Sequence, residues 1–298
     1  MTTMFDGFRD ERITIPTDAG TIAVWIGGGG PPLLLLHGYP QTRMMWHKLA
    51  PPLAASGWTV VAPDLRGYGE SGSPEPSADG ATHAKREMAR DQVALMSALG
   101  FPRFDVVGHD RGGRVAHRLA LDAPDAVARV AVLDILPTRT LLRQTDLGFA
   151  TAYWHWFFLL QSGGLPERMI GADPGWFVRE ILSRWSSDPA GIDPAAADEY
   201  VRRFTPRAIA ASCADYRAAA GPDLEHDDAD AAAGRKVTQP LLALWGAQGA
   251  MGRMYDVLAS WHEVAERARG SAVDAGHFLA EEAPHETLAA LEAFFAAT

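Results

Sequence analysis

The chain has 298 residues, of which 47% are hydrophobic and 21% charged, a composition typical of a globular protein with one large core or two domains. Its formal net charge is −10, so we expect neither nucleic acid nor an anionic membrane as a partner, and an anionic substrate would need a locally built binding site. The single cysteine, Cys213, excludes an intrachain disulfide, and the N-terminal residues lack the apolar segment of a secretion signal. We therefore expect a cytoplasmic protein.

Short apolar runs alternate with helical patterns along the chain. Each run stops at a glycine, a proline or a polar turn, and the runs cover residues 31–40, 58–71, 104–113, 129–138, 240–249 and 271–278. Helical patterns follow at residues 113–124 and 281–295. This alternation predicts an α/β fold with a mostly parallel sheet covered on both faces. Ligands bind such sheets at the carboxyl ends of the strands.

The middle of the chain differs from both ends. From about Pro137 to Asp230 the apolar spacing is helical, without strand-like runs. We interpret residues 137–235 as a helical cap inserted between two strands of a core that comprises residues 1–136 and 236–298. The acidic stretch 223–234 lacks the spacing of a calcium loop, so we expect a solvated turn there.

The sequence Gly108-His109-Asp110-Arg111-Gly112 lies between a predicted strand and a predicted helix. The layout is that of a nucleophile elbow, with Asp110 in the position of the nucleophile and glycines where side chains would crowd the turn. The alternative is that Asp110 only caps the helix. A serine that attacks a saturated carbon would leave a stable ether, whereas a carboxylate leaves an ester that water can hydrolyse. Asp110 as nucleophile therefore predicts displacement at a carbon–halogen bond or an epoxide.

The second step of such a reaction needs a base with an orienting acid. Enzymes with a nucleophile elbow carry the nucleophile, the acid and the histidine in that order along the chain. Of ten histidines, His277 alone follows the last predicted strand, where this order places the base. The acid can follow either of two strands. One offers Gln248 and no acid, while the other offers Asp134, which we therefore expect to be the partner of His277. The backbone N–H groups of Tyr39 and Arg111 are the expected oxyanion hole.

Arg111 and Arg114 are three residues apart at a helix start, so they can share one face beside the nucleophile. Two like charges in a cleft are unfavourable unless an anion binds between them. The alternative is that one of them pairs with Asp110 or with a surface acid. A fork for a substrate carboxylate, together with displacement at a saturated carbon, predicts a 2-haloacid as the substrate.

The sequence resembles the fluoroacetate dehalogenase (haloacetate dehalogenase) family of α/β hydrolases. The matching stretches run in order from about residue 31 to the C-terminus, and the most specific are GHDRGGR, WHW and DYRA. The resemblance implies Asp110, Asp134 and His277 as the catalytic residues and Arg111 and Arg114 as carboxylate ligands. It also implies that His155, Trp156 and Tyr216 donate hydrogen bonds to the halide and that Trp185 contacts the substrate. A homodimer is implied as well. Residues 140–152 depart from the family, because they carry few aromatic or basic side chains.

The sequence therefore predicts hydrolytic dehalogenation of haloacetates to glycolate and halide through a covalent ester, with water as co-substrate and without a cofactor or a metal. The runner-up is an epoxide hydrolase with the same triad, although those enzymes usually carry Trp where this chain has Arg111. A ligand-binding protein without catalysis is a third possibility, which the presence of all three triad residues disfavours.

Overall fold

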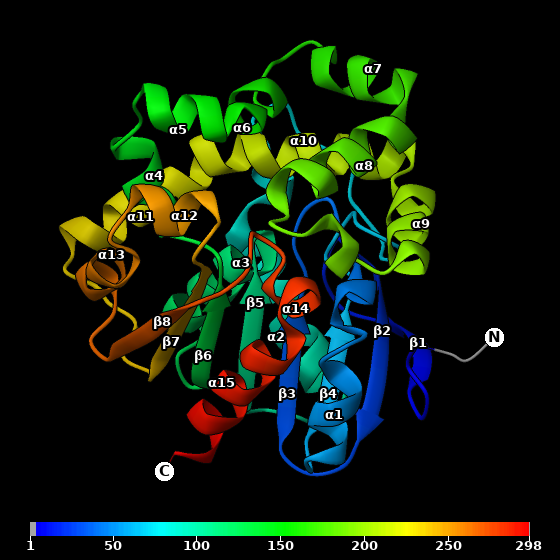
Figure 1. The fold of residues 1–298 in the computed structure, drawn as a ribbon, viewed down its shortest axis with the longest axis vertical. Helices are drawn as coiled ribbons and strands as arrows, with labels where there is room; N and C mark the ends of the chain where they lie inside the picture. The colour runs from blue at the N-terminus through cyan, green and yellow to red at the C-terminus, as the bar shows by residue number, and fades with distance from the viewer. Residues whose placement is uncertain (1–3, 298) are drawn as a thin grey trace.

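The computed structural model describes residues 4–297, and within them eight strands form one sheet in the order β1-β2-β4-β3-β5-β6-β7-β8 (Figure 1). The strands are β1 (Arg9–Thr14), β2 (Thr21–Gly28), β3 (Pro32–Leu36), β4 (Thr59–Pro63), β5 (Phe104–His109), β6 (Val127–Leu133), β7 (Leu241–Gly246) and β8 (Ala268–Val273). The pairs β1–β2 and β2–β4 are antiparallel, and all other pairs are parallel. The predicted fold class is confirmed.

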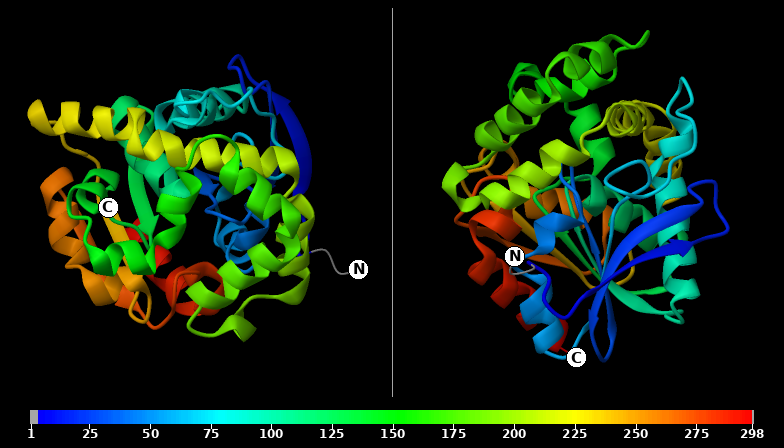
Figure 2. Two further views of the ribbon diagram at one scale, coloured as in Figure 1. Left: turned by 90° about the horizontal axis from the view of Figure 1, so that it is seen from above. Right: turned by 90° about the vertical axis from the view of Figure 1, so that its right-hand side faces the viewer.

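The central strands lie in the core of the protein. Every residue of β5 is buried, and Leu33–Leu36 of β3 have no exposed surface. Parallel strands need apolar side chains on both faces because helices cover both faces, which explains their unbroken apolar runs. Figure 2, in its right-hand view, shows α1 (Ala50–Ala55) and α15 (Pro284–Ala296) on one side of the sheet and α2 (Lys85–Ala98) on the other. Helix α3 (Arg111–Asp122) packs beside α2 and contacts β5 and β6.

The remaining helices outside the middle segment are short. They are α12 (Ala250–Met254), α13 (Val257–Val264), α14 (Leu279–Glu282) and two 3₁₀ turns, η1 (Arg43–Trp46) and η2 (Ala81–His83). No helix among residues 4–297 has both the length and the apolar character needed to cross a membrane.

Eight α-helices lie between β6 and β7, and we call them the cap helices. They are α4 (Thr138–Arg143), α5 (Leu147–Ala152), α6 (Trp154–Leu159), α7 (Leu165–Ala172), α8 (Pro174–Trp185), α9 (Pro194–Arg203), α10 (Pro206–Ala220) and α11 (Pro222–Ala232), with the 3₁₀ turn η3 (Pro189–Gly191). Figure 1 shows α5 to α10 gathered above the sheet. The limits 137 and 235 for a separate cap domain stay a proposal.

Several cap helices begin at a capping residue followed by proline. Asp173 accepts from the N–H of Trp176 (3.0 Å), and Asp193 accepts from that of Ala195 (2.8 Å). Each satisfies a backbone donor that the first helical turn leaves free, and the proline that follows has no N–H to satisfy. Each such pair begins a new helix, so the segment between β6 and β7 folds into many short helices.

The expectation of a solvated turn at residues 223–234 was wrong, because Pro222–Ala232 form α11. Pro222 occupies the first turn, and Asp223 and Glu225 follow it, where negative charge favours a helix N-terminus. Acids further along this helix are ion-pair partners. Arg118 of α3 donates to Asp227 (2.6 Å) and Asp230 (2.7 Å). The acidic run is therefore one side of an interface between α11 and the core.

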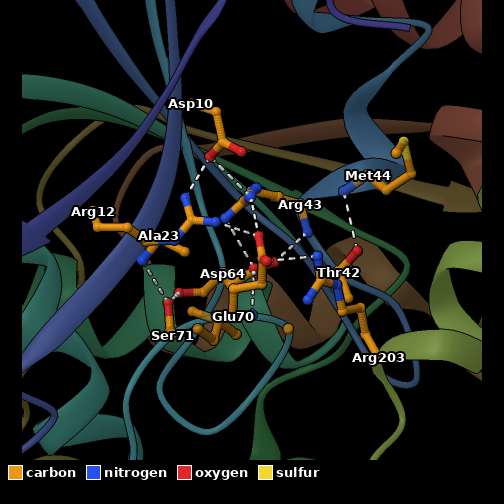
Figure 3. Close-up of polar contacts among 12 residues, drawn as sticks. Asp10, Arg12, Ala23, Thr42, Arg43, Met44, Asp64, Glu70, Ser71 and Arg203 are labelled. Carbon is orange, nitrogen blue, oxygen red and sulfur yellow. Dashed lines mark hydrogen bonds and ion pairs between the residues drawn. The ribbon is translucent and has the colours of Figure 1, made fainter. Parts of the chain in front are cut away.

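A polar cluster holds the turns that follow β3 and β4 (Figure 3). Asp64 accepts from the backbone N–H of Arg43 (2.9 Å), from its guanidinium (3.1 Å) and from the N–H of Glu70 (2.9 Å). Ser71 joins the same cluster by donating to the carbonyl of Asp64 (2.7 Å). These contacts fix the turn after β4 against the loop after β3, which carries Tyr39.

Candidate active site

Asp110 occupies a tight turn between β5 and α3, as predicted. Its φ of 46° lies in the left-handed region that non-glycine residues seldom adopt. A Cβ on Gly108 would collide with the carbonyl of Gly112, and a Cβ on Gly38 would lie 2.6 Å from that of Asp110. The flanking glycines are therefore required sterically. The Asp110 side chain makes no capping hydrogen bond to α3 and instead accepts from the N–H of Tyr39 (2.9 Å).

His277 and Asp134 form a buried pair beside Asp110. Nδ1 of His277 lies 2.6 Å from Oδ2 of Asp134, whose Oδ1 accepts from the N–H of Gly246 (2.9 Å). Asp134 follows β6 with a φ of 49°. Nε2 of His277 is buried without a hydrogen-bond partner. The ring is thus oriented through one nitrogen and free to accept a proton at the other.

The protonation of Asp110 and His277 is set by their neighbours. Burial acts to raise the pKa of Asp110, but the charges of His277 and Arg111 outweigh it and hold this pKa below its usual range. Burial acts to lower the pKa of His277, but its hydrogen bond to Asp134 and the charges of Asp134 and Asp110 raise it above the usual value. The site therefore holds an ionised carboxylate next to an imidazole of enhanced basicity.

Arg111 has a buried partner that the sequence did not indicate. Its Nε and Nη2 donate to the carboxylate of Asp215 (3.1 and 2.5 Å), and Nη2 also donates to the Asp215 carbonyl (3.0 Å). Its guanidinium lies 4.2 Å from the ring centroid of Tyr216, and Nη1 is buried without a partner. One edge of the guanidinium is therefore fixed by Asp215, and one nitrogen is left for a further acceptor.

Arg114 is held differently. Its Nη1 donates to the carbonyl of Leu136 and to the hydroxyl of Thr138 (3.0 Å each), and its Nε is buried without a partner. Burial and the charge of Arg111 lower the pKa of Arg114 to about 10. The two arginines thus disfavour each other's charge, as expected of a site that an anion would complete.

Asp215 belongs to a larger buried network. It accepts from the hydroxyl of Tyr68 (2.9 Å) and forms an ion pair with Lys85. Burial and the charge of Arg111 lower the pKa of Lys85. Helices α2, α3 and α10 meet at this network. The sequence offered no signal for it, because Lys85 and Asp215 are far apart in the chain.

The three predicted halide donors are buried together in the cap. The ring centroid of Tyr216 lies 5.5 Å from that of Trp156 and 5.7 Å from that of His155. The Tyr216 hydroxyl and Nδ1 of His155 are buried without partners. Burial raises the pKa of Tyr216 and lowers that of His155 to about 3. Both side chains are therefore neutral near pH 7, and Tyr216 keeps a proton to donate.

A cavity of about 440 Å³ opens onto Asp110 and His277. Trp185 lines it too, with its ring centroid 4.4 Å from that of His155, another residue of the wall. The other four predicted ligands are buried and do not belong to its wall; they are Arg111, Arg114, Trp156 and Tyr216. The wall also contains polar residues that sequence reasoning missed, namely Tyr153, Arg184 and Arg253, and it includes Gln248.

Two further findings bear on the chemistry of this cavity. Gln248, the residue at the strand end that offers no acid, donates to Asp274 (2.6 Å) and makes no hydrogen bond to His277 in the described part of the chain. Over the same residues, no group of three or more His, Cys, Asp or Glu side chains is arranged to hold a metal ion.

Known proteins resemble this chain over nearly its whole length. Residues 31–284 match the family model described as the alpha/beta hydrolase fold. The chain is 44% identical to the fluoroacetate dehalogenase of a Burkholderia species, over 98% of this chain and 95% of that protein. It is 37% identical to the soluble epoxide hydrolase of Corynebacterium sp. (strain C12), over 98% and 96%. The solved structure of an α/β hydrolase from Nostoc sp PCC 7120 superposes with a TM-score of 0.95 at 51% identity, covering 98% of this chain and 99% of that one.

Proposed function

Because this chain belongs to the α/β-hydrolase family, we propose that it hydrolyses the carbon–halogen bond of haloacetates with Asp110 as the nucleophile. The observation that carries the proposal is the ionised Asp110 carboxylate beside the buried His277–Asp134 pair. The adjacent Arg111 and Arg114 favour a substrate that brings its own negative charge. The similarity to a fluoroacetate dehalogenase supports the same reaction.

In the first step, a carboxylate oxygen of Asp110 attacks the carbon that bears the halogen. The new carbon–oxygen bond forms as the carbon–halogen bond breaks, and the halide leaves with the bonding electron pair. The substrate carboxylate reaches beyond the cavity wall, to which neither arginine belongs, and binds Nη1 of Arg111 and Nε of Arg114, the nitrogens that lack a partner. The halide accepts hydrogen bonds from His155, Trp156 and Tyr216, the donors that the family resemblance implies. The product of this step is an ester on Asp110.

In the second step, Nε2 of His277 takes a proton from water, and the resulting hydroxide attacks the ester carbonyl of Asp110. Backbone N–H groups stabilise the oxyanion, and the hydrogen bond that Tyr39 already donates to Asp110 supports this role. The charge of Asp110 contributes to the raised pKa of His277. Esterification removes that charge, so the pKa of His277 falls and the neutral base becomes available when it is needed. The tetrahedral intermediate then collapses, the departing alkoxide takes the proton back from His277 to leave as glycolate, and the Asp110 carboxylate is regenerated.

Epoxide hydrolysis is the competing function, because a soluble epoxide hydrolase is 37% identical to this chain. Both reactions use the same triad. Arg111 and Arg114 favour the haloacid, since a neutral epoxide gives no anionic acceptor to the two nitrogens that lack a partner, Nη1 of Arg111 and Nε of Arg114. Halide release from chloroacetate, measured beside diol formation from a neutral epoxide, distinguishes the two functions.

The carboxylate requirement gives the first expected result. Replacing Arg111 or Arg114 by glutamine removes one of the two buried charge partners of the substrate carboxylate, which costs about 2–5 kcal/mol of binding free energy. Haloacetate turnover at low substrate concentration should fall accordingly. Haloacetamides, which lack the charge, should be poor substrates of the unaltered enzyme. If the unaltered enzyme prefers haloacetamides to haloacetates in halide-release assays, the carboxylate fork is wrong.

The halide donors give a second expected result. Negative charge collects on the halogen only as its bond breaks, so donors aimed at it stabilise the transition state more than the bound substrate. A hydrogen bond to a charged group contributes ~1.5–3 kcal/mol. His155→Ala, Trp156→Phe and Tyr216→Phe should each slow fluoroacetate turnover roughly ten- to a hundredfold, and chloroacetate turnover less, because chloride is the better leaving group.

Single-turnover rates with both substrates measure this ratio. Tyr200→Phe is the matched control, because Tyr200 is a buried cap tyrosine whose hydroxyl donates to Glu281 instead (3.1 Å). It should leave the fluoride-to-chloride ratio unchanged. Equal losses on both halides in the three donor variants would mean that these side chains only pack the cap.

We also propose that the protein is a homodimer that associates through its cap. Large apolar side chains are exposed on neighbouring cap helices, with Leu165 and Met169 on α7 and Trp176 on α8. Trp176 is 60% exposed, which is unusual for a side chain of its size. The mass in solution, measured by light scattering, should be that of two chains, and Trp176→Glu should halve it. A monomeric unaltered protein would contradict this assembly.

A further inference from the structure

Glu282 lies at the end of α14 and accepts five hydrogen bonds from two separate segments. Its Oε2 accepts from the N–H of Ser187 (2.7 Å), the hydroxyl of Ser187 (2.7 Å), the N–H of Asp188 (3.2 Å) and the N–H of Gly276 (3.0 Å). Its Oε1 accepts from the N–H of Phe278 (2.9 Å). An ionised carboxylate suits this position because it only accepts, and four of the five donors are backbone groups that cannot reverse.

Both segments belong to the wall of the active-site cavity. Ser187 lies two residues after Trp185, just beyond the end of cap helix α8, and both line the cavity. Gly276 and Phe278 flank His277. The two backbones touch, because a Cβ on Gly276 would collide with Ser187 N and would lie 2.6 Å from the carbonyl of Trp185. Glu282 therefore sits where the cap meets the loop of the catalytic base.

The contacts restrain His277 from both sides along the chain. The N–H groups before and after it, on Gly276 and Phe278, donate to Glu282, and its own N–H donates to the carbonyl of Trp185 (2.9 Å). Three successive amides are thus held by one carboxylate and one cap carbonyl. The bond to Asp134 orients the imidazole ring, but it does not fix the backbone from which the ring extends.

We propose that Glu282 is a positioning residue that locks the His277 loop to the cap segment 186–188 and so places Nε2 of His277 for hydrolysis of the Asp110 ester. The inference rests on the proposed function. It assigns Glu282 to the second step only, because the hydrogen bonds of Glu282 within the described residues do not include Asp110, Arg111 or Arg114.

The charge of Glu282 gives the lock an electrostatic signature. Burial lowers the pKa of His277, the hydrogen bond and charge of Asp134 and the charge of Asp110 raise it, and Glu282 adds to the rise. The other titratable groups around the imidazole are His109, whose ring centroid lies 4.6 Å away, and His155. Removing the charge of Glu282 should therefore shift the acid limb of ester hydrolysis to lower pH.

Glu282→Gln tests the lock, because the amide keeps the shape but presents an N–H₂ group to backbone donors. We expect the single-turnover burst of halide to stay within about twofold of the unaltered enzyme, and ester hydrolysis to slow by roughly ten- to a hundredfold, the scale of a small misplacement of a catalytic group. The acid limb should move to lower pH. Glu286→Gln is the matched control, since it removes the same charge from an exposed side chain on α15 and should change neither step.

A Glu282→Gln variant with both steps unchanged would overturn the proposal, as would an equal loss in both steps, which would show only a weakened fold. Hydrogen exchange provides a readout without substrate. The amides of residues 186–188 and 276–278 should exchange faster in Glu282→Gln and not in Glu286→Gln. Unchanged protection in both segments overturns the lock even if haloacetates are hydrolysed. Faster exchange in an enzyme that releases no halide would instead disprove the proposed function and leave the contacts standing.

Discussion

Asp110→Ala is expected to abolish halide release from chloroacetate and fluoroacetate, with a loss of ~10⁴-fold or more, the scale seen when a covalent nucleophile is removed. The Asp110 carboxylate supplies the oxygen that bonds to the substrate carbon. His277 cannot replace it, because His277 only activates water for attack on the ester, and without Asp110 no ester forms. Halide-selective electrodes or ion chromatography measure the result over long incubations.

The same variant separates catalysis from binding. Asp110 carries a negative charge close to Arg111 and Arg114, so its removal should leave haloacetate binding intact or tighter. Calorimetric titration of Asp110→Ala with chloroacetate should therefore still detect binding. Substantial turnover by a folded Asp110→Ala variant would mean that water attacks the substrate directly, and the covalent mechanism would fail.

His277→Asn is expected to release one halide per active site and then stop. The first step uses only the Asp110 carboxylate and the substrate ligands, whereas the second needs the base that His277 supplies. Rapid mixing with chloroacetate should show a burst whose amplitude equals the enzyme concentration. Continued steady release at the rate of the unaltered enzyme would show that His277 is not the base.

The pH dependence of the unaltered enzyme follows from the same residue. The base works only when neutral, and the pKa of His277 is raised by its bond to Asp134. Hydrolysis of the ester should therefore fall as the pH drops through the His277 pKa, which lies lower in the ester than in the free enzyme because Asp110 is then uncharged. Asp110 itself stays ionised throughout this range, since its pKa is lowered.

Local patterns were sufficient for the fold class and for the turn around Asp110. An apolar run followed by glycines at fixed offsets specifies a strand and a tight turn, because few residues tolerate that backbone. The choice of Asp134 as the partner of His277 followed by elimination, because the other strand end at which such an acid can lie offers Gln248 and no acid. The antiparallel strands β1 and β2 were not predicted. The polar sequence of β1 resembles an exposed segment, whereas β2, with the sequence TIAVWIGG, is apolar and largely buried.

Long-range partners were beyond sequence reasoning. The pairing of Arg111 with Asp215 joins residues 104 positions apart, and no local pattern reports which acid a buried arginine will meet. The helix at Pro222–Ala232 was missed because its acids resemble a solvated turn until Arg118 of α3 is placed against them. The proposed lock by Glu282 likewise depends on contact between cap residues 187–188 and the His277 loop, and these segments are far apart in the sequence.

The central claim is a covalent ester on Asp110, and the mass of the Asp110-containing peptide tests it most directly. His277→Asn is incubated with chloroacetate, digested and compared with an untreated sample. We predict that this peptide gains one carboxymethyl group on Asp110, in an amount equal to the halide released. Halide release from a variant whose Asp110 peptide stays unmodified would contradict the account.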